Sequence, residues 1–240
     1  LSNTSNLRGF FLKTAFDLIV IGGGSGGLAC AQRAAEYGAS VALIEKAPLG
    51  GTCVNVGCVP KKVMWYASHF THQLKLAADY GFDVAVESHD WRTLKEKRDA
   101  YIKRLNKIYE TNLNKRNIYL IRGEAQFENS DTITVSETKY KARHIVIATG
   151  GQPTVPKIDG AECGITSDGF FELEDQPRDV CIVGSGYIAI EFAGMLAAMG
   201  SNVTLSIRTE SILRSFDSML SENLKKIMLH YGVEINTNKT

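Results

Sequence analysis

Cysteine and proline are scarce in this chain, which has five of each among its 240 residues. Five cysteines are too few for the disulfide framework of a secreted protein, and their number is odd, so they favour a reducing compartment. An excess of one charge is also missing, because 27 Lys and Arg stand against 26 Asp and Glu, for a formal net charge of +1. This balance favours small-molecule chemistry and gives no reason to expect nucleic acid or a membrane as a partner.

The chain also lacks a long hydrophobic run. The apolar stretch that ends at Ile21 stops at glycine, far short of the roughly 20 residues that a membrane-spanning helix needs. With 44% apolar and 22% charged residues, the composition is that of an ordinary globular protein, and we expect it to be soluble. Glycine is plentiful, with 22 residues against five prolines, which indicates glycine at specific tight turns.

Residues 1–16 contain Arg8, Lys13 and several Ser, Thr and Asn, but no acidic residue. This is the composition of a mitochondrial presequence remnant. The solvated end of a partial sequence would read the same way, and that interpretation is at least as good. We expect residues 1–16 to form a flexible N-terminal segment.

A βαβ unit follows, predicted as a strand at residues 17–21, a glycine turn, a helix to about Tyr37 and a strand at residues 41–44. The same pattern recurs with a strand at residues 179–183, a helix to about Met199 and a strand at residues 202–207. Two such starts predict two nucleotide sites.

Two long helices and several short strands are predicted between these units. One helix begins after Gly57, and the other runs from Trp91 to about Leu113. Three alternating segments, residues 117–121, 132–135 and 144–147, predict the strands of a small sheet. The first helix has an apolar stripe at helical spacing, formed by Val63, Ala67, Phe70 and Leu74.

The first glycine turn, residues 22–27, satisfies the G-x-G-x-x-G pattern between a strand and a helix. Gly22 permits the tight turn, Gly24 lets the backbone approach a pyrophosphate, and Gly27 lets the helix and strand pack closely. Glu45 closes the second strand, where a carboxylate accepts hydrogen bonds from a ribose diol. We therefore predict a dinucleotide site and give little weight to a glycine loop without a ligand.

The second turn, residues 184–189, reads GSGYIA, and its second strand is followed by Arg208 and Arg214 instead of an acid. Guanidinium groups bind a 2′-phosphate through charge-assisted bonds, whereas a carboxylate would repel it. The site is therefore predicted to prefer NADP over NAD. Either arginine alone would be better interpreted as solvated surface charge.

Cys53 and Cys58 lie between the two turns, in the run GGTCVNVGCVPKK at residues 50–62. Their spacing at the start of a helix suits a pair that cycles between disulfide and dithiol, and Lys61 together with the helix N-terminus favours the thiolate. Half of a zinc site is the competing interpretation, but no second cysteine pair or clustered His follows at ligand spacing, so no metal is expected. The other three cysteines are expected to be packing residues: Cys30, Cys163 and Cys181.

The run GGTCVNVGCVPKKVMW at residues 50–65 resembles the redox-active signature of the glutathione reductases, which are class I pyridine nucleotide-disulfide oxidoreductases. Val59 and the pair Met64-Trp65 distinguish it from the thioredoxin reductases. The resemblance runs from about Phe16 to the end of the chain. It implies an α/β fold, in which a FAD-binding Rossmann-like domain of the ββα type carries an inserted and incomplete NADP-binding Rossmann-like domain. The expected boundaries are residues 17–151 for the first, 152–178 for a connection and 179–240 for the second.

The same resemblance implies the NADPH-dependent reduction of oxidised glutathione through FAD and the Cys53–Cys58 disulfide. Cys58 would face the flavin and Cys53 would attack the substrate. Lys61, near the flavin and paired with Glu191, completes the expected catalytic set. The expected FAD residues are Gly22, Gly24, Ser25, Gly26, Gly27, Glu45, Gly51, Thr52, Cys53, Lys61, Ala125, Thr149 and Gly150. The expected NADPH residues are Gly184, Ser185, Gly186, Tyr187, Ile188, Glu191, Arg208 and Arg214.

Ser25, Gln32 and Tyr109 occupy the expected glutathione-binding positions. Some family members have Arg where this chain has Gln32, so substrate affinity is in question, with Arg33 or a water as a replacement contact. The family takes its proton donor, a His, from the partner subunit of a homodimer, and none of the five His here lies in such a motif. This chain alone is therefore expected to be inactive. A thioredoxin- or trypanothione-type reductase, or a non-catalytic flavoprotein fragment, stays an alternative. The expected location is the cytoplasm, with the mitochondrion as a second compartment.

Overall fold

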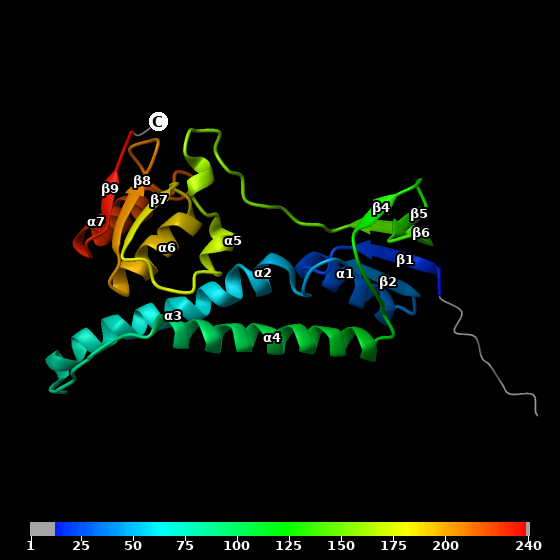
Figure 1. Cartoon of the computed structure of the whole chain (residues 1–240), viewed down its shortest axis with the longest axis horizontal. Helices are drawn as coiled ribbons and strands as arrows, with labels where there is room; N and C mark the ends of the chain where they lie inside the picture. Colours follow the sequence, from blue (N-terminus) through cyan, green and yellow to red (C-terminus); the bar gives the residue numbers. More distant parts are fainter. Residues whose placement is uncertain (1–12, 239–240) are drawn as a thin grey trace, which may run out of the picture. The chain divides into compact units, whose positions relative to one another are not determined.

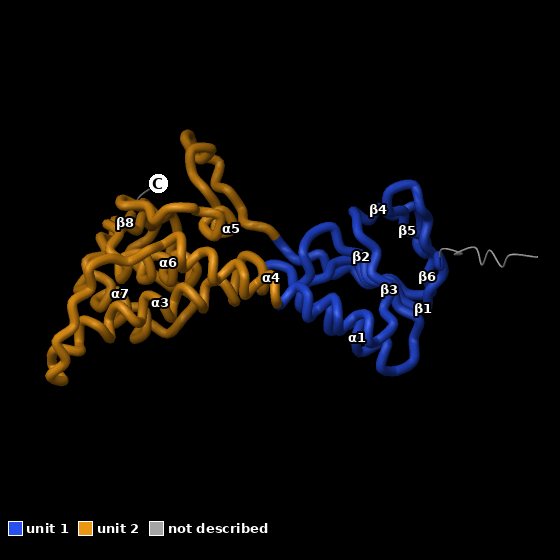
Figure 2. The backbone as a smooth tube through the Cα atoms, turned by 60° about the horizontal axis from the view of Figure 1, so that its bottom comes forward, with its two compact units in different colours: residues 1–53, 105–151 blue, residues 54–104, 152–240 orange. Residues whose placement is uncertain are grey.

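The computed structural model describes residues 13–238, which fold into helices and strands (Figure 1). They form two compact units, which Figure 2 colours separately. Unit 1 consists of the residues up to Cys53 together with Leu105–Gly151, and unit 2 of Val54–Arg104 together with the residues from Gln152 onward. Residues 54–104 thus group with the second nucleotide turn, although the sequence places them in a domain at residues 17–151. The domain boundaries themselves stay a prediction.

Unit 1 is built on a six-stranded sheet in the order β3-β2-β1-β6-β5-β4. Strands β3, β2, β1 and β6 are parallel, while β5 and β4 continue the sheet in antiparallel fashion. The bounds are β1 (Ala15–Ile21), α1 (Ser25–Glu36), β2 (Val41–Glu45), β3 (Tyr119–Arg122), β4 (Ala125–Phe127), β5 (Thr132–Val135) and β6 (Thr138–Ile147).

The expectation of a separate small sheet is wrong. β3 pairs with β2, and β6 pairs with β1, so both belong to the sheet of the first βαβ unit. The reason is the length of β6, whose first residues pair with β5 and whose later residues pair with β1. β4 was not predicted, and the expected flexible segment at residues 1–16 already enters β1 at Ala15. Residues 1–12 of that segment lie outside the described residues.

Both faces of the parallel strands are buried. Leu18 and Val20 of β1 share a core with Leu28 of α1, whereas Ile19 and Ile21 share a second core with the antiparallel strands. Because successive side chains of a strand point to opposite faces, a strand covered on both sides must be apolar throughout. This explains the continuous run LIVI before the first glycine turn.

Unit 2 contains a three-stranded parallel sheet in the order β7-β8-β9. Its elements are α3 (Cys58–Leu76), η1 (Ala77–Tyr80), η2 (Ala161–Cys163), α5 (Ser167–Phe170), β7 (Asp179–Val183), α6 (Tyr187–Ala198), β8 (Asn202–Ser206), α7 (Ser218–His230) and β9 (Glu234–Asn236). Two helices pass from one unit to the other, α2 (Gly51–Asn55) and α4 (Trp91–Lys115). Among these helices and strands, α2, α5, α7 and β9 were not predicted from the sequence. None of the helices within residues 13–238 is long and apolar enough to cross a lipid bilayer.

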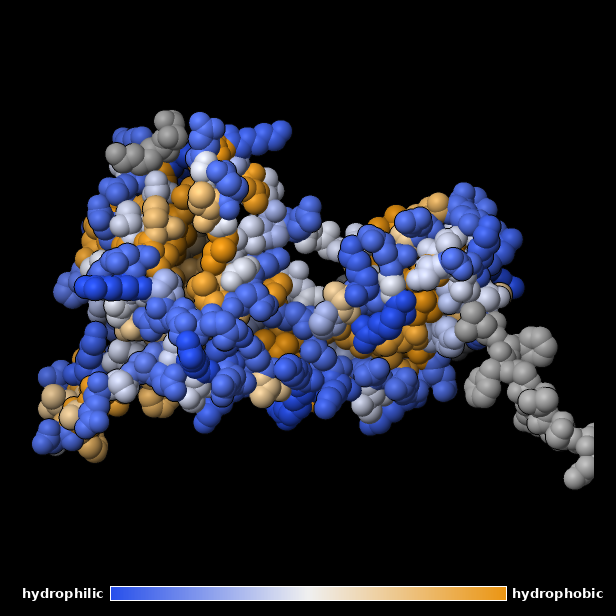
Figure 3. Space-filling view, in the orientation of Figure 1, coloured by the Kyte–Doolittle hydropathy of each residue, from blue (hydrophilic) through white to orange (hydrophobic). Residues whose placement is uncertain are grey.

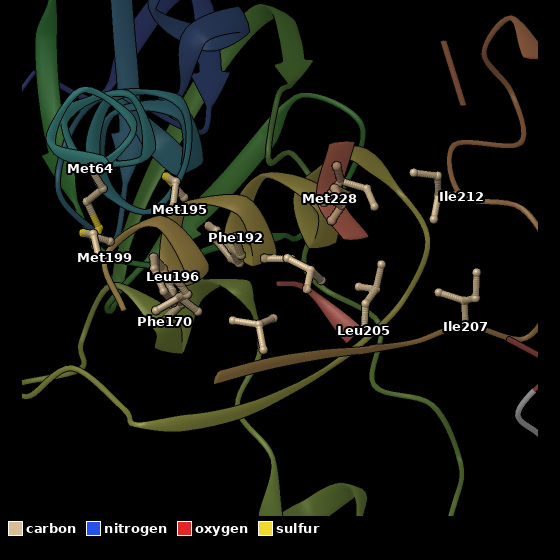
Figure 4. Packing of buried hydrophobic residues seen from close by; sticks show 14 of the residues in the cluster. Met64, Phe170, Phe192, Met195, Leu196, Met199, Leu205, Ile207, Ile212 and Met228 are labelled. Carbon is tan, nitrogen blue, oxygen red and sulfur yellow. The ribbon is translucent and has the colours of Figure 1, made fainter. Parts of the chain in front are cut away.

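The core of unit 2 joins the helix that carries Cys58 to the helix that follows the second turn. Met64 of α3 lies in one hydrophobic cluster with Met195 of α6 and with Met199, which follows the last residue of that helix (Figure 4). In the same cluster the rings of Phe170 and Phe192 stack with their centroids 4.1 Å apart. This packing fixes α3 against α6.

The predicted apolar stripe of α3 is not its buried face. Phe70 is 68% exposed and Leu74 is 37% exposed, whereas the buried residues of the helix are Pro60, Met64 and Ser68. These three residues also follow helical spacing. Because a serine and a proline are among them, their face looks less hydrophobic in the sequence than the exposed one. Packing against α6 selects the face that contains Met64.

Candidate functional site

The first glycine turn brings three chain segments together without side chains between them. The Gly22 N–H donates to the Ile44 carbonyl over 2.8 Å. A β-carbon on Gly22 would overlap the carbonyl oxygen of Ala148, and one on Gly27 would overlap the carbonyl oxygen of Gly22. Glycine is therefore required at both positions, because the backbones themselves are in contact.

A fourth segment, residues 49–51, lies against this turn. The Gly50 N–H donates to the Gly23 carbonyl over 2.8 Å, and a β-carbon on Gly51 would come within 2.7 Å of the Gly24 α-carbon. The side chain of Asn106 holds the segment by donating to the Leu49 carbonyl over 2.7 Å. The residues that follow, Thr52 and Cys53, are thereby tied to the glycine turn.

Helix α1 begins at the turn without a side-chain cap. Its N-cap is Gly24, and Ser25 and Gly26 of the first turn are exposed. Helix α7 shows the usual alternative, because the Asp217 carboxylate caps it by accepting from the Met219 N–H over 2.8 Å. Uncapped N–H groups at a helix start favour an anion such as phosphate. Together with the bare backbone of the turn, they fit a dinucleotide pyrophosphate.

Glu45 lies at the end of β2, as expected, and its carboxylate contacts the turn. One oxygen accepts from the Gly23 N–H over 2.6 Å and the other accepts from the Ala47 N–H over 2.7 Å. A carboxylate has about four acceptor sites, so each oxygen keeps a site for a further donor. The two backbone bonds fix the Glu45 carboxylate at this edge of the sheet with acceptor sites to spare, an arrangement that a ribose diol would fit.

The segment after β6 lies beside the same turn. The Ala148 N–H donates to the Ile21 carbonyl over 2.8 Å, which places Thr149 and Gly150 directly beyond the end of β1. Ala125 opens β4, which begins three residues after Arg122, the register partner of Glu45. Of the residues predicted to bind FAD, Lys61 alone lies in unit 2, and the others belong to unit 1.

Two of the expected glutathione-binding residues are engaged within unit 1. The Gln32 amide donates to the Leu28 carbonyl of its own helix over 3.1 Å, and Tyr109 packs partly buried against the core below α1. Arg33, considered as a replacement contact, forms a 3.0 Å ion pair with Glu36 and is 71% exposed. Gln32 would have to leave the Leu28 carbonyl, and Arg33 would have to leave Glu36, before either side chain could bind a substrate carboxylate.

The second glycine turn repeats the arrangement of the first. The Gly184 N–H donates to the Ser206 carbonyl over 3.0 Å, and α6 begins at Tyr187 with Gly186 as its N-cap. Tyr187 and Ile188 are both exposed. A second uncapped helix N-terminus therefore faces solvent beside a bare backbone turn.

Arg208 and Arg214 lie on either side of the segment that returns to this turn. Arg208 follows β8, and the Leu213 N–H, next to Arg214, donates to the Ser185 carbonyl over 2.8 Å. Both guanidinium groups are exposed, and in the described part of the chain neither takes part in an ion pair. The two guanidinium groups therefore place exposed positive charge near the second glycine turn.

The two cysteines of the predicted redox pair occupy consecutive helices. Cys53 lies partly buried in α2, and Cys58 is the exposed first residue of α3. Three residues later, the Lys61 ammonium meets the Glu191 carboxylate of α6 over 2.6 Å, so the ion pair expected from the sequence is present.

A groove beside Cys58 was missed by the sequence analysis. A cavity of about 560 Å³ lies between α3 and α4, lined by Cys58, Val59, Lys62, Val63, Tyr66, Lys97, Arg98 and Tyr101. Cys58, Lys62 and Tyr66 are four residues apart, as are Lys97 and Tyr101, so each set follows one face of its helix. That spacing is visible in the sequence, but the pairing of the two helices is not. The groove combines a thiol with two ammonium groups and two phenols.

Arg98 closes the inner side of this groove and is only 2% exposed. Its guanidinium donates to the Phe171 carbonyl over 2.6 Å, to Asp99 over 2.7 Å and to the Met64 sulfur over 3.3 Å. Asp99 also accepts from Lys95, and this hydrogen bond raises the pKa of the lysine ammonium. Arg98 thus ties α4 to the helix that carries Cys58.

Replacing Arg98 with methionine should lower the free energy of unfolding by about 2 kcal/mol, because the buried Phe171 carbonyl loses a charged donor. Lys103→Met, on an exposed position of the same helix, should change it by less than about 0.5 kcal/mol. Urea unfolding followed by circular dichroism measures both. Equal small changes in the free energy of unfolding of the two variants would show that the hydrogen bonds of Arg98 do not stabilise the fold.

A second cavity adjoins the second glycine turn. It has a volume of about 750 Å³, and its lining comes from β7, the start of α6 and the segment at residues 153–167. Figure 3 shows hydrophobic residues around a recess in this unit. Cys163 and Cys181 line the cavity and are exposed, so the expectation that they are packing residues is wrong. Cys30 is partly buried beside the core of unit 1.

Within residues 13–238, no three His, Cys, Asp or Glu side chains are grouped so that they could hold a metal ion.

Residues 16–240 match the family described as pyridine nucleotide-disulphide oxidoreductase.

The chain belongs to the pyridine nucleotide-disulphide oxidoreductase family.

Relatives within this family include two yeast proteins named glutathione reductase. That of Schizosaccharomyces pombe is 50% identical over 236 residues, which cover 95% of this chain and 51% of the relative. That of Yarrowia lipolytica is 48% identical over 234 residues, which cover 92% of this chain and 50% of the relative. The chain therefore spans about half the length of these relatives. The family description names both a pyridine nucleotide, which the second glycine turn suggests, and a disulphide, which the cysteine pair suggests.

Proposed function

We propose that this chain is the nucleotide- and disulfide-bearing part of an NADPH-dependent glutathione reductase that uses FAD. The observation that carries the proposal is the position of the two cysteines: Cys53 lies in α2, Cys58 is the exposed first residue of α3, and the Lys61–Glu191 ion pair follows three residues later. Two relatives named glutathione reductase, which are 50% and 48% identical to this chain, support oxidised glutathione as the substrate. The arginines after the second glycine turn support NADPH as the hydride donor.

The residues of unit 1 suit the FAD. The uncapped start of α1 and the bare backbone of Gly24 and Gly51 would hold its pyrophosphate, and Glu45 would hold its ribose. When bound, the flavin supplies the redox chemistry that links a two-electron hydride donor to a disulfide. Glu191 holds the Lys61 ammonium in place, and we assign this pair to the same reaction centre.

The cysteine pair would pass two electrons to glutathione by thiol–disulfide exchange. In the reduced pair, the Cys53 thiolate attacks one sulfur of oxidised glutathione, whose S–S bond breaks, and one glutathione leaves as a thiolate and takes up a proton. The Cys58 thiolate then attacks the Cys53 sulfur, which restores the Cys53–Cys58 disulfide and releases the second glutathione. The two electrons that NADPH supplies end on two glutathione thiols. We propose that the full-length protein is a homodimer and that the partner subunit supplies the proton donor.

Positive charge near the cysteine pair favours an anionic substrate such as glutathione, which carries carboxylates. Lys62 and Lys97 supply two ammonium groups in the groove beside Cys58. Trypanothione carries a cationic polyamine that two ammonium groups would repel. A reducing compartment, the cytoplasm or the mitochondrion, suits this chemistry.

Steady-state rates of the full-length enzyme with oxidised glutathione, lipoamide, trypanothione and thioredoxin test the substrate. We expect the highest kcat/KM with glutathione, and the assignment fails if glutathione is a poor substrate. On this chain alone, addition of FAD and then NADPH under anaerobic conditions should bleach the flavin absorbance. Flavin reduction without any formation of protein thiols would favour the alternative, a flavoprotein fragment without disulfide chemistry.

A further inference from the structure

The loop that carries Arg214 contains a strained residue. Leu213 has φ +48°, the left-handed region, which is rare for a bulky side chain. Such a conformation persists only where the surrounding contacts determine it, and it tends to occur at functional sites. Contacts around the loop must therefore hold Leu213 in this conformation.

Three contacts hold this loop against the rest of unit 2. The Leu213 N–H donates to the Ser185 carbonyl of the glycine turn over 2.8 Å. The side chains of Ile212 and Leu213 are 0% and 8% exposed. The Ser221 hydroxyl, in the first turn of α7, donates to the Ile212 carbonyl over 2.6 Å, and Ser221 is itself only 8% exposed.

We propose that Ser221 is a positioning residue that sets the preference of the second nucleotide site for a 2′-phosphate, because it holds the loop that presents Arg214. The inference rests on the proposed use of NADPH. Without the hydroxyl, the buried Ile212 carbonyl loses its donor, and the loop can relax Leu213 out of the left-handed region. Arg214 then moves away from the phosphate position. NAD has no 2′-phosphate, so its binding does not depend on this geometry.

Ser221→Ala tests the proposal, with Ser218→Ala as the matched control. Ser218 is an exposed residue at the start of the same helix, and its hydroxyl has no hydrogen-bond partner in the described residues. Titration calorimetry of the chain with NADP⁺ and NAD⁺ gives the two dissociation constants. We expect Ser221→Ala to raise the Kd for NADP⁺ about tenfold, the scale set by one buried hydrogen bond. The Kd for NAD⁺, and both constants of the control, should stay within about twofold.

Equal losses for NADP⁺ and NAD⁺, or no loss for either, would overturn the proposal. If the alanine variant does not fold, Ser221→Cys, which has the same shape with a larger atom and a much weaker donor, gives the same comparison. Arg214→Ala tests the phosphate contact separately from the role of Ser221. If that variant keeps its preference for NADP⁺, Arg214 does not hold the 2′-phosphate, and the proposed role of Ser221 is wrong as well. If it loses the preference while Ser221→Ala does not, the phosphate site stands and the role of Ser221 is wrong.

Discussion

Replacing Gly27 with alanine should lower the free energy of unfolding by about 3 kcal/mol or more, the upper range for an overpacked position. The new methyl group would overlap the carbonyl oxygen of Gly22. That oxygen cannot move aside easily, because the Gly22 N–H is bonded to Ile44 and the residue lies against Ala148. Helix α1 would have to shift away from the sheet.

Gly26→Ala is the matched control, one residue earlier in the same helix. A β-carbon on Gly26 would meet nothing within 4 Å, and alanine is a better helix former than glycine by about 1 kcal/mol. This variant should therefore be as stable as the parent chain or slightly more so. Thermal or urea unfolding without added nucleotide compares the two directly. Similar losses in both variants would mean that the close approach of α1 and β1 does not limit stability.

The two glycine turns were predictable from the sequence, because their constraints are local. A strand, a glycine pattern and a helix follow one another within a few residues, and the structure places β1, α1 and β2 within two residues of the predicted bounds. β5 and β7 match their predicted ranges fully. Glu45 was located for the same reason, since the end of β2 fixes its distance from the turn.

Long-range pairings were not predictable in the same way. β6 joins the antiparallel strands to β1, and a single sequence does not say which strands become neighbours. The buried face of α3 was misjudged because Pro60, Met64 and Ser68 form a less hydrophobic stripe than the exposed one. Arg98 was missed because a buried arginine looks like any solvated one until Phe171, 73 residues away, supplies the acceptor. The groove beside Cys58 depends on that same helix pairing.

Replacing both Arg208 and Arg214 with alanine should raise the Kd for NADP⁺ by about 100-fold or more, since a hydrogen bond to a charged group contributes about 1.5–3 kcal/mol. The Kd for NAD⁺ should change by less than about threefold, because NAD⁺ lacks the 2′-phosphate. Titration calorimetry at low ionic strength measures both constants. The difference should shrink as salt is added, because both guanidinium groups are exposed and are screened by ions.

A double variant with the same change in net charge distinguishes a specific phosphate site from the general field of the protein. Arg178→Ala with Lys226→Ala also removes two exposed cations from unit 2. Arg178 precedes β7, at the opposite end of the strand from the glycine turn, so this variant should keep most of its preference for NADP⁺. If both double variants lose the preference equally, the loss reflects net charge alone. If neither loses it, the two arginines are solvated surface charge, and other residues must recognise the 2′-phosphate.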